Sequence, residues 1–167
     1  GSLFQTTSEQ IERVIKTNLL GPMWCTREIL GLIDNAPRSG RTPTVVNVAS
    51  MTGRLGLLGA SDYAASRFGL VGFTEASWKE LTKRGIRTMM VNSGWIWPGR
   101  SGAERIGGKR FTSWMIMDPA RVAKAMVRGI ERGGFEVRVQ WWWHLAYRAA
   151  VLMGPLQRVV AKLKIKS

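Results

Sequence analysis

The chain has 167 residues, of which 45% are hydrophobic and 22% are charged, a composition that supports a folded domain with a core and excludes a disordered polypeptide. A single cysteine, Cys25, excludes an intramolecular disulfide and favours a reducing, cytoplasmic setting, in which we expect Cys25 to pack as a small core residue. The formal charge of +14 indicates an anionic partner, which is a nucleic acid, a membrane surface, or an anionic cofactor or substrate.

The first predicted element is a long helix that begins at Thr7 or Ser8, because either residue can cap a helix. Apolar residues recur at near-helical spacing from there to Ile33. The pair Gly21 and Pro22 predicts a kink near the middle, since proline interrupts the helical hydrogen bonds.

The remainder of the chain alternates between strand and helix patterns. Two β-branched or apolar runs are typical of buried parallel strands, and Asp118 followed by proline predicts a capped helix start. The predicted elements are a strand over 43–49, a helix over 61–83, a strand over 86–92, an irregular segment over 93–117, a helix over 118–133, a strand over 135–139 and a helical stretch from 141. This order predicts an α/β fold with a parallel sheet and helices on its faces.

Three residues of this pattern carry a possible chemistry. Tyr63 and Arg67 stand four residues apart on the predicted helix and therefore share a face. A fixed positive charge stabilises the phenolate form of a tyrosine, which suits it to exchange a proton with an alcohol or a carbonyl oxygen. Ser50 ends the strand before that helix, at the sheet edge where ligands bind. An ordinary helix face and a loop-capping serine are the alternative interpretations.

In combination these motifs resemble those of the short-chain dehydrogenase/reductase family. Residues 45–81 resemble its core signature, in which a strand ends in Ser and a Gly-containing loop leads to Tyr-x-x-x-Lys on a long helix. Three further ranges match its Asn-bearing helix, its nicotinamide turn, and its late helix with the final strand: 11–30, 85–100 and 118–137. The likeness runs from residue 7 to residue 139 and implies a partial Rossmann-like, doubly wound parallel sheet with flanking helices.

The resemblance implies catalytic roles for four residues. Tyr63 would be the general acid/base, and Ser50 would orient the substrate oxygen. Arg67 takes the place of the family lysine, which binds the nicotinamide ribose and acidifies the tyrosine. Asn18 would hold a water in the proton relay to residue 67. The family reaction interconverts an alcohol and a carbonyl compound by hydride transfer, with NAD or NADP as cofactor, and the sequence leaves the choice of cofactor open.

Two further groups of residues border this site in the resemblance. The nicotinamide turn comprises Ser93, Gly94 and Ile96, and apolar residues on the substrate side are Leu57, Trp95 and Trp97. Their apolar character predicts a small lipophilic alcohol or ketone as substrate. Ordinary packing of a mobile lid is the alternative interpretation.

The sequence departs from the family pattern at three places. Arg67 replaces a lysine and cannot realistically release a proton. Ser93 and Pro98 replace a proline and a threonine of the nicotinamide turn, so one cofactor contact should be missing. No Gly-rich phosphate-binding turn is found. We therefore expect residues 1–140 to be the C-terminal portion of a dinucleotide-binding domain, and the oxidoreductase activity to belong to the parent protein.

Residues 141–167 form a second predicted unit, a basic aromatic tail. Three consecutive tryptophans and a lysine-rich end suit an amphipathic helix on an anionic membrane. An extension that packs over the substrate pocket or a partner subunit is the alternative. His144 is the only histidine, which leaves little material for a metal site or a Ser-His-Asp triad.

The principal hypothesis is therefore an NAD(P)-dependent oxidoreductase, with a non-catalytic interaction or membrane-surface module as the alternative. Nucleic-acid binding is suggested by charge and aromatic residues alone, and no recognition motif supports it, so we expect no nucleic-acid partner. The family often forms oligomers through the helices that match residues 8–33 and 61–83, and we expect the parent protein to be a homo-oligomer.

Overall fold

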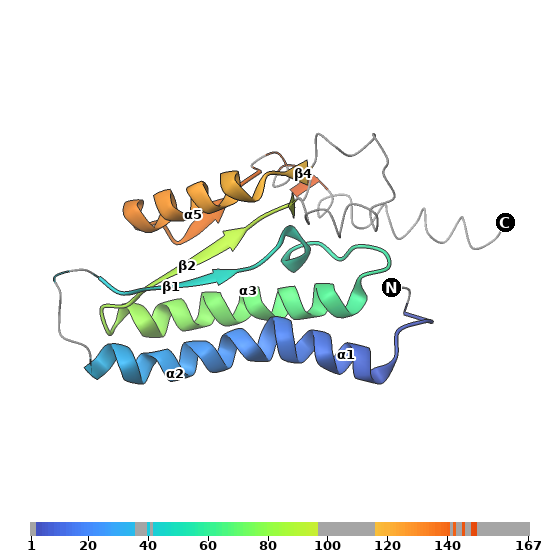
Figure 1. The fold of residues 1–167 in the computed structure, drawn as a ribbon, viewed down its shortest axis with the longest axis horizontal. Helices are drawn as coiled ribbons and strands as arrows, with labels where there is room; N and C mark the ends of the chain where they lie inside the picture. Colours follow the sequence, from blue (N-terminus) through green and yellow to red (C-terminus); the bar gives the residue numbers. More distant parts are fainter. Residues whose placement is uncertain are drawn as a thin grey trace.

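The computed structural model describes residues 3–35, 40, 42–96, 116–140, 142, 145 and 148–149. A nearly continuous helical run opens the chain, and strands and helices alternate after it (Figure 1). The elements in order are α1 (Ser8–Ile15), the π-helix η1 (Lys16–Leu20), α2 (Gly21–Asn35), β1 (Thr44–Val48), the 3-10 turn η2 (Met51–Gly53), α3 (Ser61–Thr82), β2 (Arg87–Asn92), β3 (Trp95–Ile96), β4 (Ile116–Met117), α5 (Pro119–Arg132) and β5 (Glu136–Arg138).

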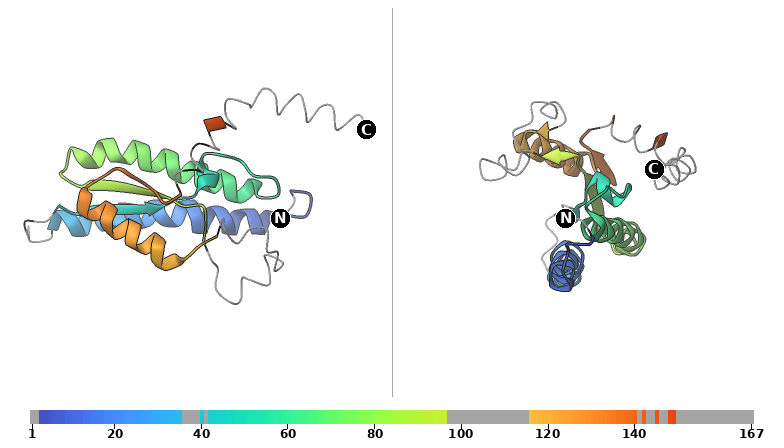
Figure 2. Two further views of the ribbon diagram at one scale, coloured as in Figure 1. Left: turned by 90° about the horizontal axis from the view of Figure 1, so that it is seen from above. Right: turned by 90° about the vertical axis from the view of Figure 1, so that its right-hand side faces the viewer.

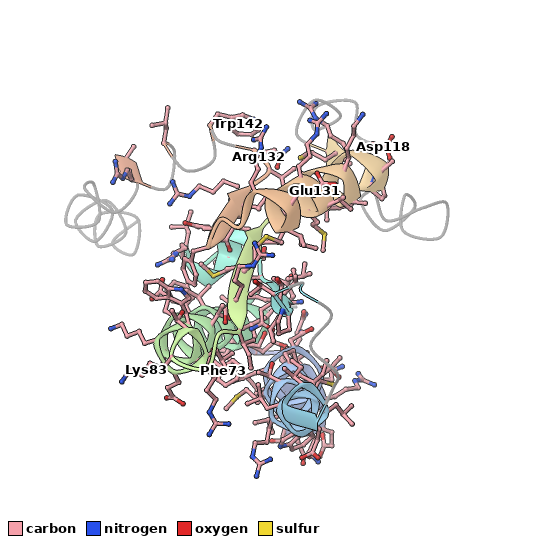
Figure 3. The ribbon with its side chains drawn as sticks, turned by 90° about the vertical axis from the view of Figure 1, so that its left-hand side faces the viewer. Phe73, Lys83, Asp118, Glu131, Arg132 and Trp142 are labelled. Atoms are coloured by element: carbon pink, nitrogen blue, oxygen red, sulfur yellow. The ribbon has the colours of Figure 1, made fainter. Side chains whose placement is uncertain are left out.

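The main sheet is parallel and has the strand order β1-β2-β5. The helices α1, α2 and α3 cover one face, and α5 covers the other (Figures 1 and 2). Figure 3, in which Phe73 and Lys83 mark α3 while Glu131 and Arg132 mark α5, shows these helices on opposite sides of the sheet. The predicted α/β fold with a parallel sheet and flanking helices is confirmed.

The core lies around the central strand β2, which is covered on both faces. Met90 is fully buried and packs with Leu70 and Val71 of α3. Met89 faces the other way, toward α5, where a Cβ atom at Gly129 would lie 2.8 Å from its sulfur and 2.3 Å from Cγ2 of Val137. This two-sided burial explains why Met89, Met90 and Val91 are apolar in succession.

The helix ends follow their sequence signals. Thr7 caps α1 and forms a capping box with Gln10. Asp118 caps α5 by accepting a hydrogen bond from the backbone N–H of Ala120 at 2.9 Å. Gly133 ends α5 with φ of +72°, a conformation that favours glycine. These elements therefore begin and end close to the predicted residues.

The first helix has an irregular segment directly before Gly21 and Pro22. Pro22 has no N–H to donate to the carbonyl of Asn18, and the N–H of Gly21 reaches back to the carbonyl of Lys16 instead. The chain accommodates this mismatch as the π-helix η1.

Of two further expectations for local structure, one is corrected in part and the other falls largely outside the described residues. The segment 93–117, predicted to be irregular, begins and ends in the parallel strands β3 and β4, so the prediction is wrong at both ends. A short extended pair of this kind has no periodic signal of its own. Residues 97–115 lie outside the described residues, as does most of the tail after residue 140.

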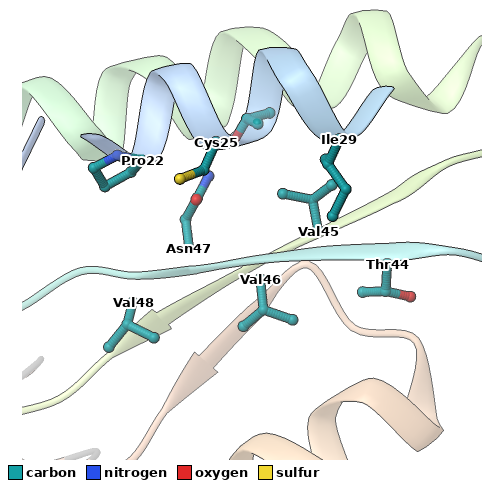
Figure 4. A pocket seen from close by; sticks show the side chains of 9 residues that line it. Pro22, Cys25, Ile29, Thr44, Val45, Val46, Asn47 and Val48 are labelled. Carbon is teal, nitrogen blue, oxygen red and sulfur yellow. The ribbon is translucent and has the colours of Figure 1, made fainter. Parts of the chain in front are cut away.

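Cys25 is exposed, which corrects the expectation that it packs in the core. It lines an open groove between α2 and the free edge of β1, together with Pro22, Ile29 and residues 44–48 (Figure 4). Within the described part of the chain no strand pairs with that edge of β1. A helical pattern marks Cys25 as facing the sheet, but it cannot tell whether another segment covers that place.

We expect Gly129→Ala to lower the free energy of unfolding by about 1–3 kcal/mol, because the new methyl group overpacks α5 against β2 and β5. Gly72→Ala is the matched control, since nothing lies within 4 Å of a Cβ atom there and alanine stabilises a helix by up to about 1 kcal/mol. Urea unfolding of both variants measures the difference. Equal stability of the two variants would show that α5 is not closely packed at Gly129.

Candidate active site

The carboxyl ends of β1 and β2 stay together beyond the strands. The N–H of Ala49 donates to the carbonyl of Val91 at 2.9 Å, and that of Met51 donates to the carbonyl of Ser93 at 3.0 Å. Ser50 lies between these two bonds and is 9% exposed. The chain that carries it is therefore fixed beside the end of the neighbouring strand.

The hydroxyl of Ser50 is oriented by the turn that follows it. Its oxygen accepts a hydrogen bond from the backbone N–H of Thr52 at 3.3 Å, at the start of η2. Because the hydroxyl uses an acceptor site in this bond, its O–H remains able to donate to an oxygen of a bound molecule.

Tyr63 and Arg67 lie on the first two turns of α3, as their spacing predicts. The guanidinium carbon of Arg67 lies 4.9 Å from the centroid of the Tyr63 ring. A cation at this distance over an aromatic face attracts the ring electrostatically and restrains both side chains. The pair is therefore a cation–π contact as well as two residues on one helix face.

The guanidinium of Arg67 joins three segments of the chain. Nη1 donates to the carbonyl of Val48 at 3.2 Å, and Nη2 donates to Oδ1 of Asn18 at 3.1 Å. The first acceptor lies at the end of β1, two residues before Ser50, and the second lies in η1. Asn18, Tyr63 and Arg67 thus meet at the carboxyl end of β1, two residues before Ser50.

The π-helix brings Asn18 close to α3. Gly69 of α3 meets Leu19 so closely that a Cβ atom there would lie 2.8 Å from a methyl carbon of Leu19. This close approach brings η1 within reach of Arg67, whose Nη2 bonds Asn18 directly. The role of the Val48 carbonyl as an acceptor could not be predicted from the sequence, because every residue type carries the same backbone carbonyl.

The predicted cofactor turn lies beside this cluster. Ser93 is buried, and its carbonyl accepts from the turn after Ser50. Gly94 leads into β3, where Ile96 pairs with Met117. The Trp97 position and the substituted Pro98 fall outside the described residues.

Two of the predicted substrate-side residues are described. Leu57 is half-buried in the loop between η2 and α3, where its carbonyl accepts from the N–H of Ala60 at 3.2 Å. Trp95 is 40% exposed at the start of β3. Leu58, beside Leu57, is fully exposed. The loops after β1 and β2 therefore present apolar side chains to solvent.

We expect Arg67 and Asn18 to be energetically coupled. The variants Arg67→Met, Asn18→Ala and the double variant should give a coupling of about 1 kcal/mol in urea unfolding, because each single change removes the same charge-assisted hydrogen bond. Arg128→Met, a change at an exposed residue of α5, should alter stability by no more than about 0.5 kcal/mol. Strict additivity of the two single changes would refute the coupling.

The known proteins to which this chain is similar are dehydrogenases and reductases. The model of the short chain dehydrogenase family matches residues 2–104. The chain is 37% identical over 95 residues to carbonyl reductase family member 4 of Xenopus laevis, covering 56% of this chain and 38% of that protein. It is 39% identical over 94 residues to a 3-oxoacyl-[acyl-carrier-protein] reductase of Bos taurus, with the same coverage of 56% and 38%. The ketoacyl reductase HetN of Nostoc is 31% identical over 141 residues, covering 83% and 47%.

Solved structures share the fold at lower sequence identity. A short chain dehydrogenase/reductase from Burkholderia phymatum in complex with NAD has a TM-score of 0.73 and 17% identity, and the match covers 94% of this chain and 63% of that one. A short-chain dehydrogenase from Sphingobium yanoikuyae in complex with NADPH has a TM-score of 0.68 and 24% identity, with coverage of 96% and 60%. The chain thus spans about two fifths of the length of the first two curated relatives above.

Proposed function

The chain belongs to the short chain dehydrogenase family, and we propose that it provides the catalytic residues of an NAD(P)-dependent oxidoreductase that interconverts an alcohol and a carbonyl compound. The observation that carries the proposal is the Arg67 guanidinium, which stacks on Tyr63 and bonds to Val48 and Asn18 at the end of β1. The relatives named as carbonyl and ketoacyl reductases support the reaction class.

Tyr63 moves the proton in the proposed reaction. During reduction its hydroxyl gives a proton to the substrate oxygen as the carbonyl carbon gains a hydride, and in the reverse direction the phenolate takes the proton back. A bound nicotinamide cofactor supplies or accepts the hydride. Ser50 donates a hydrogen bond to the same substrate oxygen, and the positive charge of Arg67 lies over the Tyr63 ring and holds it in place.

The residues at this edge fit the sugar and amide groups of a nicotinamide nucleotide. Nε of Arg67 is buried and makes no hydrogen bond to the described residues, so this donor is suited to a ribose hydroxyl. Tyr63 would hold the same sugar. Ser93, Gly94 and Ile96 would meet the carboxamide with backbone groups. Either NAD or NADP satisfies these contacts.

Arg67 changes one part of the expected chemistry. The guanidinium has donors only and keeps its proton, so residue 67 cannot pass a proton to Tyr63 as an amine could. Asn18 meets the guanidinium through its side chain. We therefore propose that Arg67 supplies a positive charge and holds Tyr63 in place, and that a group other than residue 67 returns the proton to Tyr63.

The proposed substrate is a small lipophilic alcohol or ketone. Leu57, Leu58 and Trp95 support this class, because they line the loops after β1 and β2 with apolar side chains that are at least partly exposed. Trp97 belongs to the same proposal on sequence grounds.

The function is tested by NADPH and NADH oxidation against a panel of lipophilic ketones, with the gene product that contains this chain. We expect Tyr63→Phe to lower kcat by about 100-fold or more, because it removes the proton donor and keeps the ring. Tyr147→Phe makes the same chemical change at the other tyrosine and should leave kcat unchanged. Turnover that survives Tyr63→Phe would refute the assignment of Tyr63.

In the same assay we expect Arg67→Lys to raise kcat. An amine keeps the charge beside Tyr63 and can exchange protons, which a guanidinium cannot. If Arg67→Lys turns over more slowly than the unmutated protein, the planar guanidinium of Arg67 with its two acceptors contributes more to kcat than proton exchange does. No turnover and no cofactor binding in either protein would favour a non-catalytic module.

We further propose a homo-oligomer formed through α1–α2 and α3. Large apolar side chains on these helices support it, among them Trp24 at 57% and Phe68 at 46% exposure. Light scattering should give a mass above that of a monomer, and a Phe68→Glu variant should reduce it. A monomer at micromolar concentration would exclude this assembly.

Contact with a membrane through residues 141–167 stays a proposal, because these residues lie largely outside the described part. The helices that the structure describes include none with the length and apolar character needed to cross a bilayer.

A further inference from the structure

We infer that Gly53 is a positioning residue that sets the placement of Ser50 relative to Tyr63. The inference rests on the proposed function, because it concerns the two hydroxyl groups that would bind one substrate oxygen. Gly53 has no catalytic group of its own. Its role follows from the space between the turn η2 and the helix α3.

Two hydrogen bonds link the turn η2 to Ser50. The N–H of Gly53 donates to the carbonyl of Ser50 at 2.8 Å, and the N–H of Thr52 donates to the Ser50 hydroxyl oxygen at 3.3 Å. All three residues of η2 are buried. A displacement of Gly53 is therefore transmitted to both the backbone and the side chain of Ser50.

Gly53 lies directly against the backbone of α3. A Cβ atom there would be 2.8 Å from the carbonyl oxygen of Arg67 and 2.8 Å from Cγ2 of Val71, whereas ordinary contact begins at 3.4 Å. The carbonyl is part of the helix and cannot rotate away as the end of a flexible side chain could. A methyl group must therefore separate η2 from the turn of α3 that holds Arg67 and Tyr63.

The residue after Gly53 is held in place. Arg54 forms an ion pair with Glu75 of α3 at 2.5 Å, two helical turns beyond Arg67. The turn therefore contacts α3 at two successive residues, through the backbone at Gly53 and through the side chain at Arg54.

The backbone conformation does not require glycine at this position. The glycines with positive φ are Gly40, Gly59, Gly85 and Gly133 within the described residues, and Gly53 is not among them. Alanine can adopt the backbone angles of Gly53, so a Gly53→Ala variant tests the space alone. A shift of several tenths of an ångström between two groups that share a substrate oxygen is enough to impair their alignment.

The test uses Gly53→Ala in the gene product that contains this chain. We expect kcat for ketone reduction to fall about tenfold while KM for the cofactor stays unchanged, since the substrate oxygen is misaligned and the Arg67 guanidinium keeps its acceptors. Gly72→Ala, on the solvent side of α3, should leave kcat unchanged. Gly129→Ala should lower the melting temperature and leave kcat unchanged, which separates lost stability from lost alignment.

Amide hydrogen exchange at Thr52, followed by NMR, provides a readout that needs no turnover. We expect faster exchange in Gly53→Ala and unchanged exchange in Gly72→Ala, because the bond from Thr52 to Ser50 loosens. If the unmutated protein is active and the Gly53→Ala variant has the same kcat, the inference is overturned. If the unmutated protein is inactive, the proposed function is contradicted. The exchange at Thr52 then tests the role of Gly53, and unchanged protection in Gly53→Ala overturns that role.

Discussion

The direct bonding of one guanidinium to two oxygens of different segments organises this end of the molecule. Arg67 reaches Val48 on the sheet and Asn18 on the first helix while it covers the Tyr63 ring. A single ammonium group offers the same charge without a planar fork that can hold two acceptors at once. The arginine therefore combines a positive charge and hydrogen bonds to two segments in one side chain.

Two glycines that allow close contacts add to the interactions of Arg67. Gly53 lets η2 reach α3, and Gly69 lets η1 reach the same helix from another side. Each contact places a segment with a polar group against the turns that carry Tyr63 and Arg67. The helix α3 thus contacts both the sheet edge and the first helix and carries Tyr63 and Arg67, and these close contacts require the absence of a side chain at Gly53 and Gly69.

The sequence predicted the features that depend only on residues close together in the chain. Thr7 and Asp118 as helix caps, the apolar run of β2 and the four-residue spacing of Tyr63 and Arg67 all express local rules, and the structure agrees with them. The exposure of Cys25 and the pairing of β3 with β4 depend on which segments meet in space, which no local pattern encodes. The proximity of Asn18 to Arg67 came from family resemblance, whereas the direct bond between their side chains required coordinates.

The π-helix η1 has a consequence for how this chain can tolerate insertions and deletions. A π turn is equivalent to one extra residue accommodated within a regular α-helix. Removing one residue from Lys16–Leu20 would restore the regular repeat and leave α1 and α2 facing as they do, because the π turn absorbs the rotation of about 100° that one extra residue adds. Adding one residue within α1 or α2 would rotate one half of the helix, so that either Asn18 would turn away from Arg67, or α2 would turn Cys25 and Ile29 away from β1. The segment Lys16–Leu20 is therefore where this helix best accommodates a change of one residue in length, although Asn18 lies within it.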